Sequence, residues 1–250
     1  MLHRSGPLGE AQVAVSDRWG GVSTGPHAEL NLADHVGDDP QHVAENRGRL
    51  ASVLGLAPGS VAFMTQVHGC EVAVIDGPPS PGDIGLLPVP RADALVTRAQ
   101  GVALAVLVAD CVPVLLAGPS PAGPVVAAAH AGRRGVSLGV VTATIETMAG
   151  LGARPERMSA LVGPAVCAQC YEVPAAMAQE FLASVPSARA TSRTGTPALD
   201  LPAAVTAQLH TAGVGDVVVD PTCTAQDPSL YSHRRDAVTG RFAGVVWTAG

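Results

Sequence analysis

The chain has 250 residues, a formal net charge of -6 and a hydrophobic content of 47%, which suits one globular domain with a sizeable core. Its 15 basic side chains are all arginine, so Schiff-base catalysis, a phosphate-loop lysine and a lysine general base are excluded. The acidic net charge and an aromatic content of 3% argue against a nucleic acid partner.

Cysteine usage points to a reducing compartment. The five cysteines are odd in number and widely spaced, and the first residues, MLHRSGPLGE, lack the apolar core of a signal peptide. The longest apolar run, 101–109, is too short to span a bilayer. We therefore expect a cytoplasmic protein with no membrane partner, in which each free thiol is a candidate ligand, nucleophile or buried filler.

Short strands and one helix are predicted over the first half of the chain. Asp39-Pro40 marks the start of a helix that ends near Gly55. The prolines that crowd residues 77–90 predict an exposed loop. Strands are predicted at 11–15, 61–64, 71–75 and 92–97, and in two apolar runs within 101–117 that are separated by a turn at 110–113.

Strands and helices alternate through the second half as well. GPVVAAAHAGRRG (123–135) predicts a strand, a glycine turn and the start of a helix that continues through 140–148. A helix at 201–212 has Asp200 as its expected N-cap. The remaining predicted elements are a helix at 174–182 and strands at 158–162, 217–220 and 244–247. Without a linker or a break in composition, the pattern predicts one mixed α/β domain over 1–250.

Three polar residues stand out because they end or begin apolar strands. His68 lies in TQVHG, Cys111 in VLVADCVPVLL and His130 in VVAAAHAGRRG. Two imidazoles and one thiolate are a sufficient set of ligands for Zn²⁺, with a fourth position left for water or substrate. Their spacing matches no short metal motif, so packing of each side chain in the core is the competing interpretation.

A resemblance to a known family is carried by an ordered set of motifs: TQVHG, ADALVT, ADCVPVLLA, AAAHAGRRG, GPAVCAQCYEV and LYSHRRD…TGRFAGVVW. These segments resemble the bacterial laccase-domain family, which is YfiH-like and is also called the multicopper polyphenol oxidase or purine nucleoside phosphorylase family. The similarity covers nearly the whole chain. It implies a single α/β (α+β) domain with mixed β-sheets flanked by helices, similar to the fold of cytotoxic necrotizing factors.

The resemblance also implies a zinc enzyme. The family's His–Cys–His zinc site corresponds to His68, Cys111 and His130, and ENRGRL resembles the helix with the family's active-site arginine, which is Arg47 here. The implied activity is phosphorolysis of adenosine, inosine, guanosine or methylthioadenosine, together with deamination of adenosine. The implied partners are therefore a purine nucleoside and phosphate, with copper as an alternative to zinc.

The two reactions ask for different residues. Phosphorolysis needs an anion clamp, which the guanidinium of Arg47 could supply, aided by backbone N–H groups near Gly132 and Gly135. Deamination by zinc enzymes uses an acidic proton shuttle in an H-x-E motif that this chain lacks. The candidate substitutes for that acid are Asp93, Asp110 and Glu172.

Some features depart from the expected pattern. Arg133 stands where the family has an aromatic residue in AHAGWRG, and His233 in LYSHRRD stands at another usual aromatic position. Both changes leave fewer rings for purine stacking. Cys167-x-x-Cys170 is the sole C-x-x-C motif of the sequence, and the resemblance puts Cys170 beside the active site without making it a ligand.

Alternative functions follow from the same residues. Cys111 could act as the nucleophile of a cysteine hydrolase with His130 as its base. The departure at Arg133 leaves room for a non-catalytic, partner-binding protein that keeps a metal site. A copper-dependent polyphenol oxidase of the multicopper type would need about ten histidines for its copper centres, whereas this chain has 8.

Overall fold

Strand β7 (Val112–Gly118) packs apolar side chains on both of its faces in the computed structural model, which describes residues 1–57, 59–77 and 89–248. Val114 and Leu116 belong to one hydrophobic cluster, and Leu115 and Ala117 belong to another. Because successive side chains point to opposite faces of a strand, an unbroken apolar run such as this needs cover on both sides. β7 therefore lies in a sheet that has a layer above it and a layer below it.

The described strands around β7 form a six-stranded mixed sheet in the order β12-β9-β7-β8-β5-β4. β8 pairs antiparallel with both β7 and β5, whereas β4 runs parallel to β5 and β12 runs parallel to β9. The other bounds are β12 Asp216–Val219, β9 Ser159–Val162, β8 Val125–Ala131, β5 Ala94–Thr97 and β4 Val72–Val74.

A second sheet has five described strands in the order β1-β2-β13-β6-β3. The C-terminal strand β13 pairs antiparallel with β2 and with β6, so the two ends of the chain meet in this sheet. Its strands are β1 Leu2–Leu8, β2 Ala11–Ser16, β13 Phe242–Thr248, β6 Ala103–Val108 and β3 Val61–Ala62. A separate antiparallel ribbon is formed by β10 Arg189–Thr191 and β11 Pro197–Leu199.

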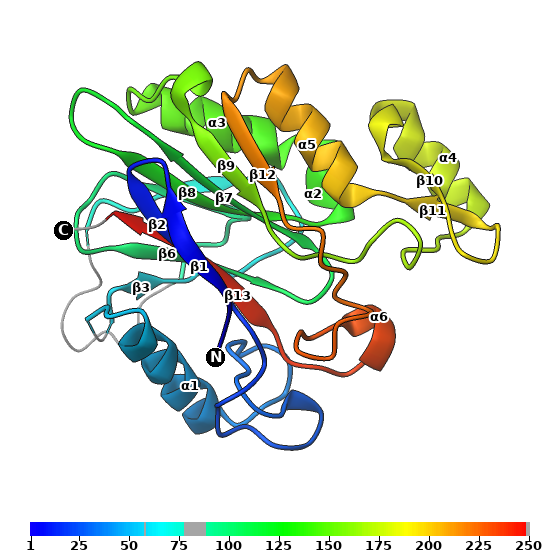
Figure 1. The fold of residues 1–250 in the computed structure, drawn as a ribbon, viewed down its shortest axis with the longest axis horizontal. Helices are drawn as coiled ribbons and strands as arrows, with labels where there is room; N and C mark the ends of the chain where they lie inside the picture. The colour runs from blue at the N-terminus through cyan, green and yellow to red at the C-terminus, as the bar shows by residue number, and fades with distance from the viewer. Residues whose placement is uncertain (58, 78–88, 249–250) are drawn as a thin grey trace.

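Helices cover the outer face of each sheet (Figure 1). The helices α2, α3 and α5 lie over the six-stranded sheet, and α1 lies against the five-stranded sheet on the opposite side of the molecule. The helices of the described chain are α1 Pro40–Val53, α2 Arg133–Leu138, α3 Val140–Gly150, α4 Ala175–Ser184, α5 Leu201–Thr211 and α6 His233–Asp236, with 3-10 turns at Gly25–His27, Pro155–Arg157 and Pro186–Ala188.

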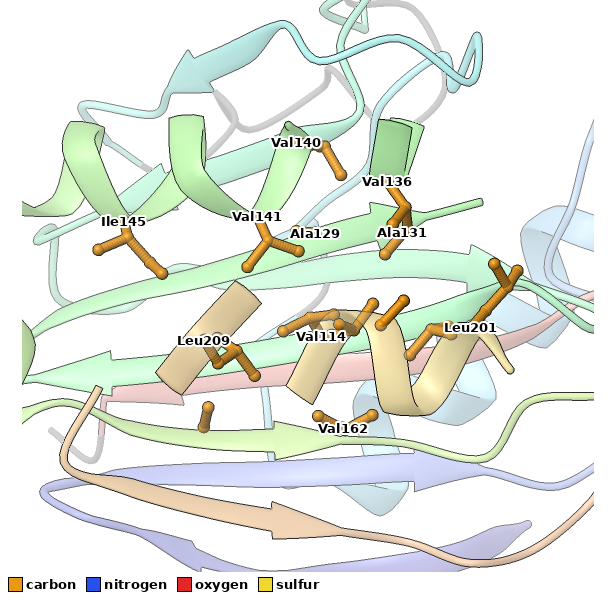
Figure 2. Packing of buried hydrophobic residues seen from close by; sticks show 14 of the residues in the cluster. Val114, Ala129, Ala131, Val136, Val140, Val141, Ile145, Val162, Leu201 and Leu209 are labelled. Carbon is orange, nitrogen blue, oxygen red and sulfur yellow. The ribbon is translucent and has the colours of Figure 1, made fainter. Parts of the chain in front are cut away.

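The helices over the six-stranded sheet, the two sheets and α1 form four layers. The core is divided into three apolar clusters, one between each pair of neighbouring layers. Figure 2 shows Val141 and Ile145 of α3 and Leu209 of α5 packed over Val114 and Val162 of the six-stranded sheet. A middle cluster joins the two sheets face to face, and an outer cluster joins α1 to the five-stranded sheet. Burial of these apolar faces stabilises the fold by about 25 cal/mol for each Å² removed from water.

Most of the elements predicted from the sequence are confirmed. The predicted cap at Asp200 is confirmed, because Asp200 accepts a hydrogen bond from the Ala203 amide. The helix predicted to start at Asp39-Pro40 begins there, and Asp39 caps it by accepting a hydrogen bond from the Gln41 amide. Strand β1, the ribbon β10–β11 and the short helix α6 were not predicted. The expected strand at 61–64 covers two residues, Val61–Ala62, and most of the loop expected at 77–90 lies outside the described residues.

The prediction of one helix from residue 133 through 148 is wrong. The chain turns at Gly139, whose φ of 85° lies in the left-handed region, and this residue ends α2 and precedes α3. Leu138, the last residue of α2, is exposed, whereas Val140 and Val141 at the start of α3 are buried. The apolar pattern runs through both helices, and a left-handed glycine between them is compatible with it.

No helix in the described residues is both long enough and apolar enough to cross a membrane.

Substitution of Gly139 tests the break between α2 and α3. No atom lies within 4 Å of a Cβ added at Gly139, so Gly139→Ala should destabilise the fold by about 1 kcal/mol through the left-handed backbone alone. Gly150→Ala is the matched control, because Gly150 ends α3 in equally open space without a positive φ and the change should be neutral or stabilising. Urea denaturation measures both changes. An equal effect of the two substitutions would contradict the assigned turn.

Candidate functional site

One end of the six-stranded sheet collects four polar residues. Cys111 directly precedes β7, and His130 lies in β8 opposite Pro113 of β7. Asp93 directly precedes β5, whose Ala94 pairs with Ala129, so Asp93 is a neighbour of His130. His68 lies in the segment before β4, which pairs with β5. The order β7-β8-β5-β4 therefore brings together residues that are far apart in sequence.

The three side chains predicted as metal ligands converge. One ligand atom from each of His68, Cys111 and His130 lies within 4.8 Å of the other two. Cys111 Sγ is 3.8 Å from His68 Nε2, and the two imidazole rings meet edge to face with their centroids 4.7 Å apart. His68 is exposed, Cys111 is half-buried and His130 is buried. The cluster is therefore open to solvent on one side.

Asp93 fixes the positions of His68 and His130. Its carboxylate is fully buried and accepts hydrogen bonds from the backbone N–H groups of Val67, His68 and Gly69, the shortest at 2.6 Å. It also accepts a hydrogen bond of 2.9 Å from His130 Nδ1. Burial raises the pKa of Asp93, but the hydrogen bonds from His130 and Gly69 outweigh it and hold the pKa below the usual value. With Nδ1 bound to Asp93, His130 turns its Nε2 toward the cluster.

The electrostatics favour an ionised thiol. Burial disfavours the thiolate of Cys111, but the charge of His130 overrides it and lowers the pKa of the thiol to about 6. The pKa of His130 is raised to about 9, because Cys111 and Asp93 together outweigh the opposing effect of burial. At neutral pH the two groups therefore form a thiolate–imidazolium pair, and the thiolate is the form of cysteine that binds metals.

Asp110 fixes the turn that presents Cys111. Its φ of 97° is unusual for a residue with a side chain. Three groups compensate, because the carboxylate accepts hydrogen bonds from Thr224 Oγ1 and Ser232 Oγ at 2.7 Å each and from the Arg234 amide. All three partners come from the C-terminal part of the chain, which therefore sets the position of Cys111.

The glycines after His130 are explained by close packing. A Cβ at Gly132 would lie 2.7 Å from His68 Cδ2 and 3.1 Å from Cys111 Sγ. A Cβ at Gly135 would lie 2.9 Å from the carbonyl oxygen of Gly69. Both positions require glycine because the start of α2 passes directly against the cluster.

Arg47 does not contact the cluster in the described hydrogen bonds and ion pairs. Its Nε donates to the Leu32 carbonyl at 2.9 Å, its NH2 group lies 3.3 Å from Asp34, and its guanidinium stacks over Phe63. Leu32 in turn donates its N–H to the carbonyl of Arg241. Arg47 is therefore connected to the site through Leu32 and the backbone of Arg241.

The charge of Cys111 acts on Arg241 and Tyr171, two side chains that sequence reasoning did not assign to the site. Burial lowers the pKa of Arg241, and the negative charges of Cys111 and Asp110 counter that effect. Burial raises the pKa of Tyr171, while Arg133 and Arg234 lower it. The Arg234 guanidinium lies 5.0 Å from the centre of the Tyr171 ring. The motifs CYEV, HRRD and TGRF contain most of these residues, but their sequence gives no distance to Cys111.

The acids considered for proton transfer are differently placed. Asp93 and Asp110 are engaged in the hydrogen bonds described above, whereas Glu172 is exposed and its Oε2 lies 3.5 Å from Thr194 Oγ1. His233 is exposed on α6, and its Nδ1 contacts the Ala237 carbonyl rather than the cluster.

Comparison with known proteins agrees with this architecture. Residues 12–249 match the family model described as multi-copper polyphenol oxidoreductase laccase. The chain is 51% identical over 246 residues to the purine nucleoside phosphorylase ORF3 of Streptomyces griseus, and the match covers 98% of both proteins.

Solved structures share the fold. The crystal structure of protein NMB0706 of Neisseria meningitidis is 35% identical, with a TM-score of 0.84 and 99% of each chain covered. YlmD from Geobacillus stearothermophilus is 32% identical, with a TM-score of 0.85, and the match covers 98% of this chain and 94% of that one.

Asp93→Asn should loosen the cluster. An amide replaces one acceptor oxygen by a donor, so the backbone amides of residues 67–69 and His130 Nδ1 compete for fewer acceptors. Loss of a carboxylate that orients a histidine ligand costs 10–100-fold in metal affinity as an order of magnitude. Competition with a chelator of known affinity measures it. The exposed residue Asp216 supplies the control Asp216→Asn, and equal metal affinities in the two variants would contradict the role assigned to Asp93.

Proposed function

The chain belongs to the multi-copper polyphenol oxidoreductase laccase family, and on that premise we propose that it is a zinc-dependent purine nucleoside phosphorylase. The observation that carries the proposal is the convergence of His68, Cys111 and His130, in a chain that shares half of its residues with a protein named for that activity. The proposed substrates are inosine, guanosine, adenosine or methylthioadenosine, together with phosphate. The five free cysteines support the cytoplasm as the compartment.

The donor set fits Zn²⁺. Bonds of about 2.0–2.1 Å to nitrogen and about 2.3 Å to sulfur require ligand atoms that are roughly 3.3–3.8 Å apart in a tetrahedral site. The present separations of up to 4.8 Å need only a small contraction. Two imidazoles and a thiolate leave one position free, as in catalytic zinc sites. Copper is the alternative occupant, because nitrogen and sulfur ligands bind it more tightly than zinc.

The protein's own groups divide the work. A zinc ion bound here would supply Lewis-acid charge where negative charge develops during the reaction. Asp93 keeps Nε2 of His130 directed at the cluster, and the Asp110 turn keeps the thiolate of Cys111 beside it. These residues place the ligands before substrate arrives, so little reorganisation is needed during the reaction.

Phosphate recognition falls to the arginines around the cluster. The charge of Cys111 acts on Arg241, and the charges of Arg133 and Arg234 act on Tyr171. Guanidinium groups bind phosphate through two parallel hydrogen bonds, and they keep their charge at any physiological pH. We assign phosphate binding to Arg241 first, because in the described hydrogen bonds its NH1 group alone is engaged, with the carbonyls of Thr239 and Gly240. Arg47 has the lesser role in phosphate binding, because its Nε and NH2 groups already contact Leu32 and Asp34.

We assign purine stacking to the ring of Tyr171. Tyr171 is half-buried, and the charge of Cys111 acts on it. The guanidinium of Arg234 lies 5.0 Å from the centre of the Tyr171 ring. The presence of this ring offsets the loss of an aromatic residue at position 133. Stacking on this ring supports any purine base equally, which fits a broad range of nucleosides.

Adenosine deamination is the proposed secondary reaction. It needs a carboxylic acid that can move a proton at the purine, and the carboxylates of Asp93 and Asp110 are already engaged in orienting bonds. Glu172, the exposed candidate, follows Tyr171 in sequence. Phosphorolysis is favoured because it needs arginine side chains to bind phosphate, and more than one arginine is assigned to that role.

A second candidate function rests on the thiolate–imidazolium pair. A thiol whose pKa is lowered to about 6 beside a histidine is also the arrangement of a cysteine nucleophile with its base. Metal content distinguishes the candidates, because a bound zinc ion prevents Cys111 from attacking a substrate. Alkylation of Cys111 that is blocked by zinc would support the metal enzyme.

A nucleoside assay tests the proposed function. Purified protein with adenosine and phosphate should release adenine and ribose 1-phosphate, and Cys111→Ala should abolish the reaction together with binding of zinc to His68 and His130. Omission of phosphate separates the activities, because inosine formed without phosphate reports deamination. Cys70→Ala, at a cysteine outside the cluster, is the control. Absence of adenine from the zinc-loaded wild type, or full activity in Cys111→Ala, would overturn the proposal.

Substitution of the arginines tests phosphate recognition. Loss of one charged hydrogen-bonding group costs about 1.5–3 kcal/mol, so Arg241→Gln should raise the KM for phosphate by about tenfold or more. Arg47→Gln should raise it less, because its guanidinium is partly engaged elsewhere. The exposed Arg98 gives the control Arg98→Gln. Steady-state kinetics at saturating nucleoside measure all three, and a phosphate KM in Arg241→Gln equal to that of the control contradicts the assignment.

A further inference from the structure

A second group of sulfur atoms lies apart from the His68–Cys111–His130 cluster. The Sγ atoms of Cys167, Cys170 and Cys223 all lie within 4.8 Å of one another, and the three cysteines are free. Gln226 Nε2 lies 3.2 Å from Cys170 Sγ and 3.6 Å from Cys167 Sγ. We call these four residues the thiol cluster.

The thiol cluster is built from two turns of the same length. Cys170 donates its N–H to the Cys167 carbonyl at 2.9 Å, and Gln226 donates its N–H to the Cys223 carbonyl at 3.0 Å. The turns are joined, because the Cys167 amide donates to Cys223 Sγ at 3.3 Å and Ala165 forms a β-bridge with Cys223. Two facing turns with a ligand at each end are the framework of structural zinc sites of the C-x-x-C type. Here the second turn, Cys-x-x-Gln, has an amide at the fourth position.

We propose that Cys167, Cys170 and Cys223 bind a second Zn²⁺ ion, with the amide oxygen of Gln226 or a water molecule as the fourth ligand. Zn–S bonds of about 2.3 Å place tetrahedral sulfur ligands about 3.8 Å apart, so the observed grouping needs only a small contraction. The amide group of Gln226 already faces two of the sulfur atoms, and rotation of that amide would bring its oxygen to the same place. Thiolates select a thiophilic ion over Mg²⁺ or Ca²⁺.

The charge and burial of the thiol cluster also favour a cation. Cys223 is buried, at 8% exposure, whereas Cys167 and Cys170 are half-buried at the molecular surface. A zinc ion could therefore enter from solvent. The three sulfur atoms would bind a divalent ion as thiolates, so each thiol releases its proton when the ion binds.

The second site is connected to the first through Asp110. Val166, which precedes Cys167, donates its N–H to the Asp110 carbonyl at 3.0 Å. Thr224, which follows Cys223, donates its hydroxyl to Asp110 Oδ1 at 2.7 Å. A metal that joins the two turns would therefore brace the turn that presents Cys111. The second site does not depend on the proposed nucleoside chemistry.

Metal analysis of single and double variants tests the proposal. Protein purified under a phosphine reductant and loaded with zinc should hold about two zinc ions per chain by mass spectrometry of the metals. Cys170→Ser should lower the content to about one, Cys111→Ala should also lower it to about one, and the double variant should retain none. Cys70→Ser is the control and should keep both. Half-buried Cys170 is chosen because substitution of buried Cys223 would disturb folding.

Cobalt substitution reports the ligands directly. Co²⁺ bound in Cys111→Ala should give a strong sulfur-to-metal charge-transfer band in the near ultraviolet, and Cys170→Ser in the same background should remove it. Gln226→Cys should strengthen the band and raise affinity at least tenfold, because it completes a set of four thiolates. An unchanged zinc content in Cys170→Ser overturns the proposal. The proposal is also overturned if reduced wild-type protein takes up one zinc ion per chain, and Cys167, Cys170 and Cys223 form only a disulfide when the protein is reoxidised.

Discussion

The buried carboxylate of Asp93 is the constraint on which the candidate site depends. One side chain accepts hydrogen bonds from three successive backbone amides and from His130 Nδ1, and thereby joins the segment before β4 to the end of β8. The same bonds hold His68 at a φ of 57°, a left-handed conformation that costs free energy for a residue with a side chain. A buried charge without such partners would cost several kcal/mol as an order of magnitude, so the loop and the carboxylate stabilise each other.

The layered fold supplies the rigid frame around that carboxylate. β8 is buried throughout, and its valines and alanines let the two sheets and the helices over them approach closely. Close approach continues at Gly132, where the backbone passes against His68 and Cys111. The site therefore lies at the edge of the core and is not built from long loops. This position favours side chains that are held in place before any metal or substrate binds.

Sequence patterns predict the parts of this structure whose signal is local. The unbroken apolar runs that became β6, β7 and β8, the helix start at Asp39 and the placement of Cys111 and His130 at strand ends all follow from neighbouring residues. His68 lies instead in the segment between β3 and β4. The role of Asp93 does not follow from neighbouring residues, because it arises from strand order, which brings β5 between β4 and β8. The same is true of Arg241 and Tyr171, whose relation to Cys111 is created by packing across the molecule.

Asp110 is a common support for the His68–Cys111–His130 cluster and the thiol cluster. Its φ of 97° is held by Thr224, Ser232 and the Arg234 amide, and its own carbonyl receives the Val166 N–H. Any loosening of the turns at Cys167 or Cys223 removes part of this support from the residue next to Cys111. A cation in the thiol cluster would therefore affect the geometry of Cys111 without touching it, because Val166 and Thr224 connect the turns of that cluster to Asp110. Four of the five free cysteines then have a place in a cluster, one in the first and three in the second, while Cys70 packs against the hydrophobic core.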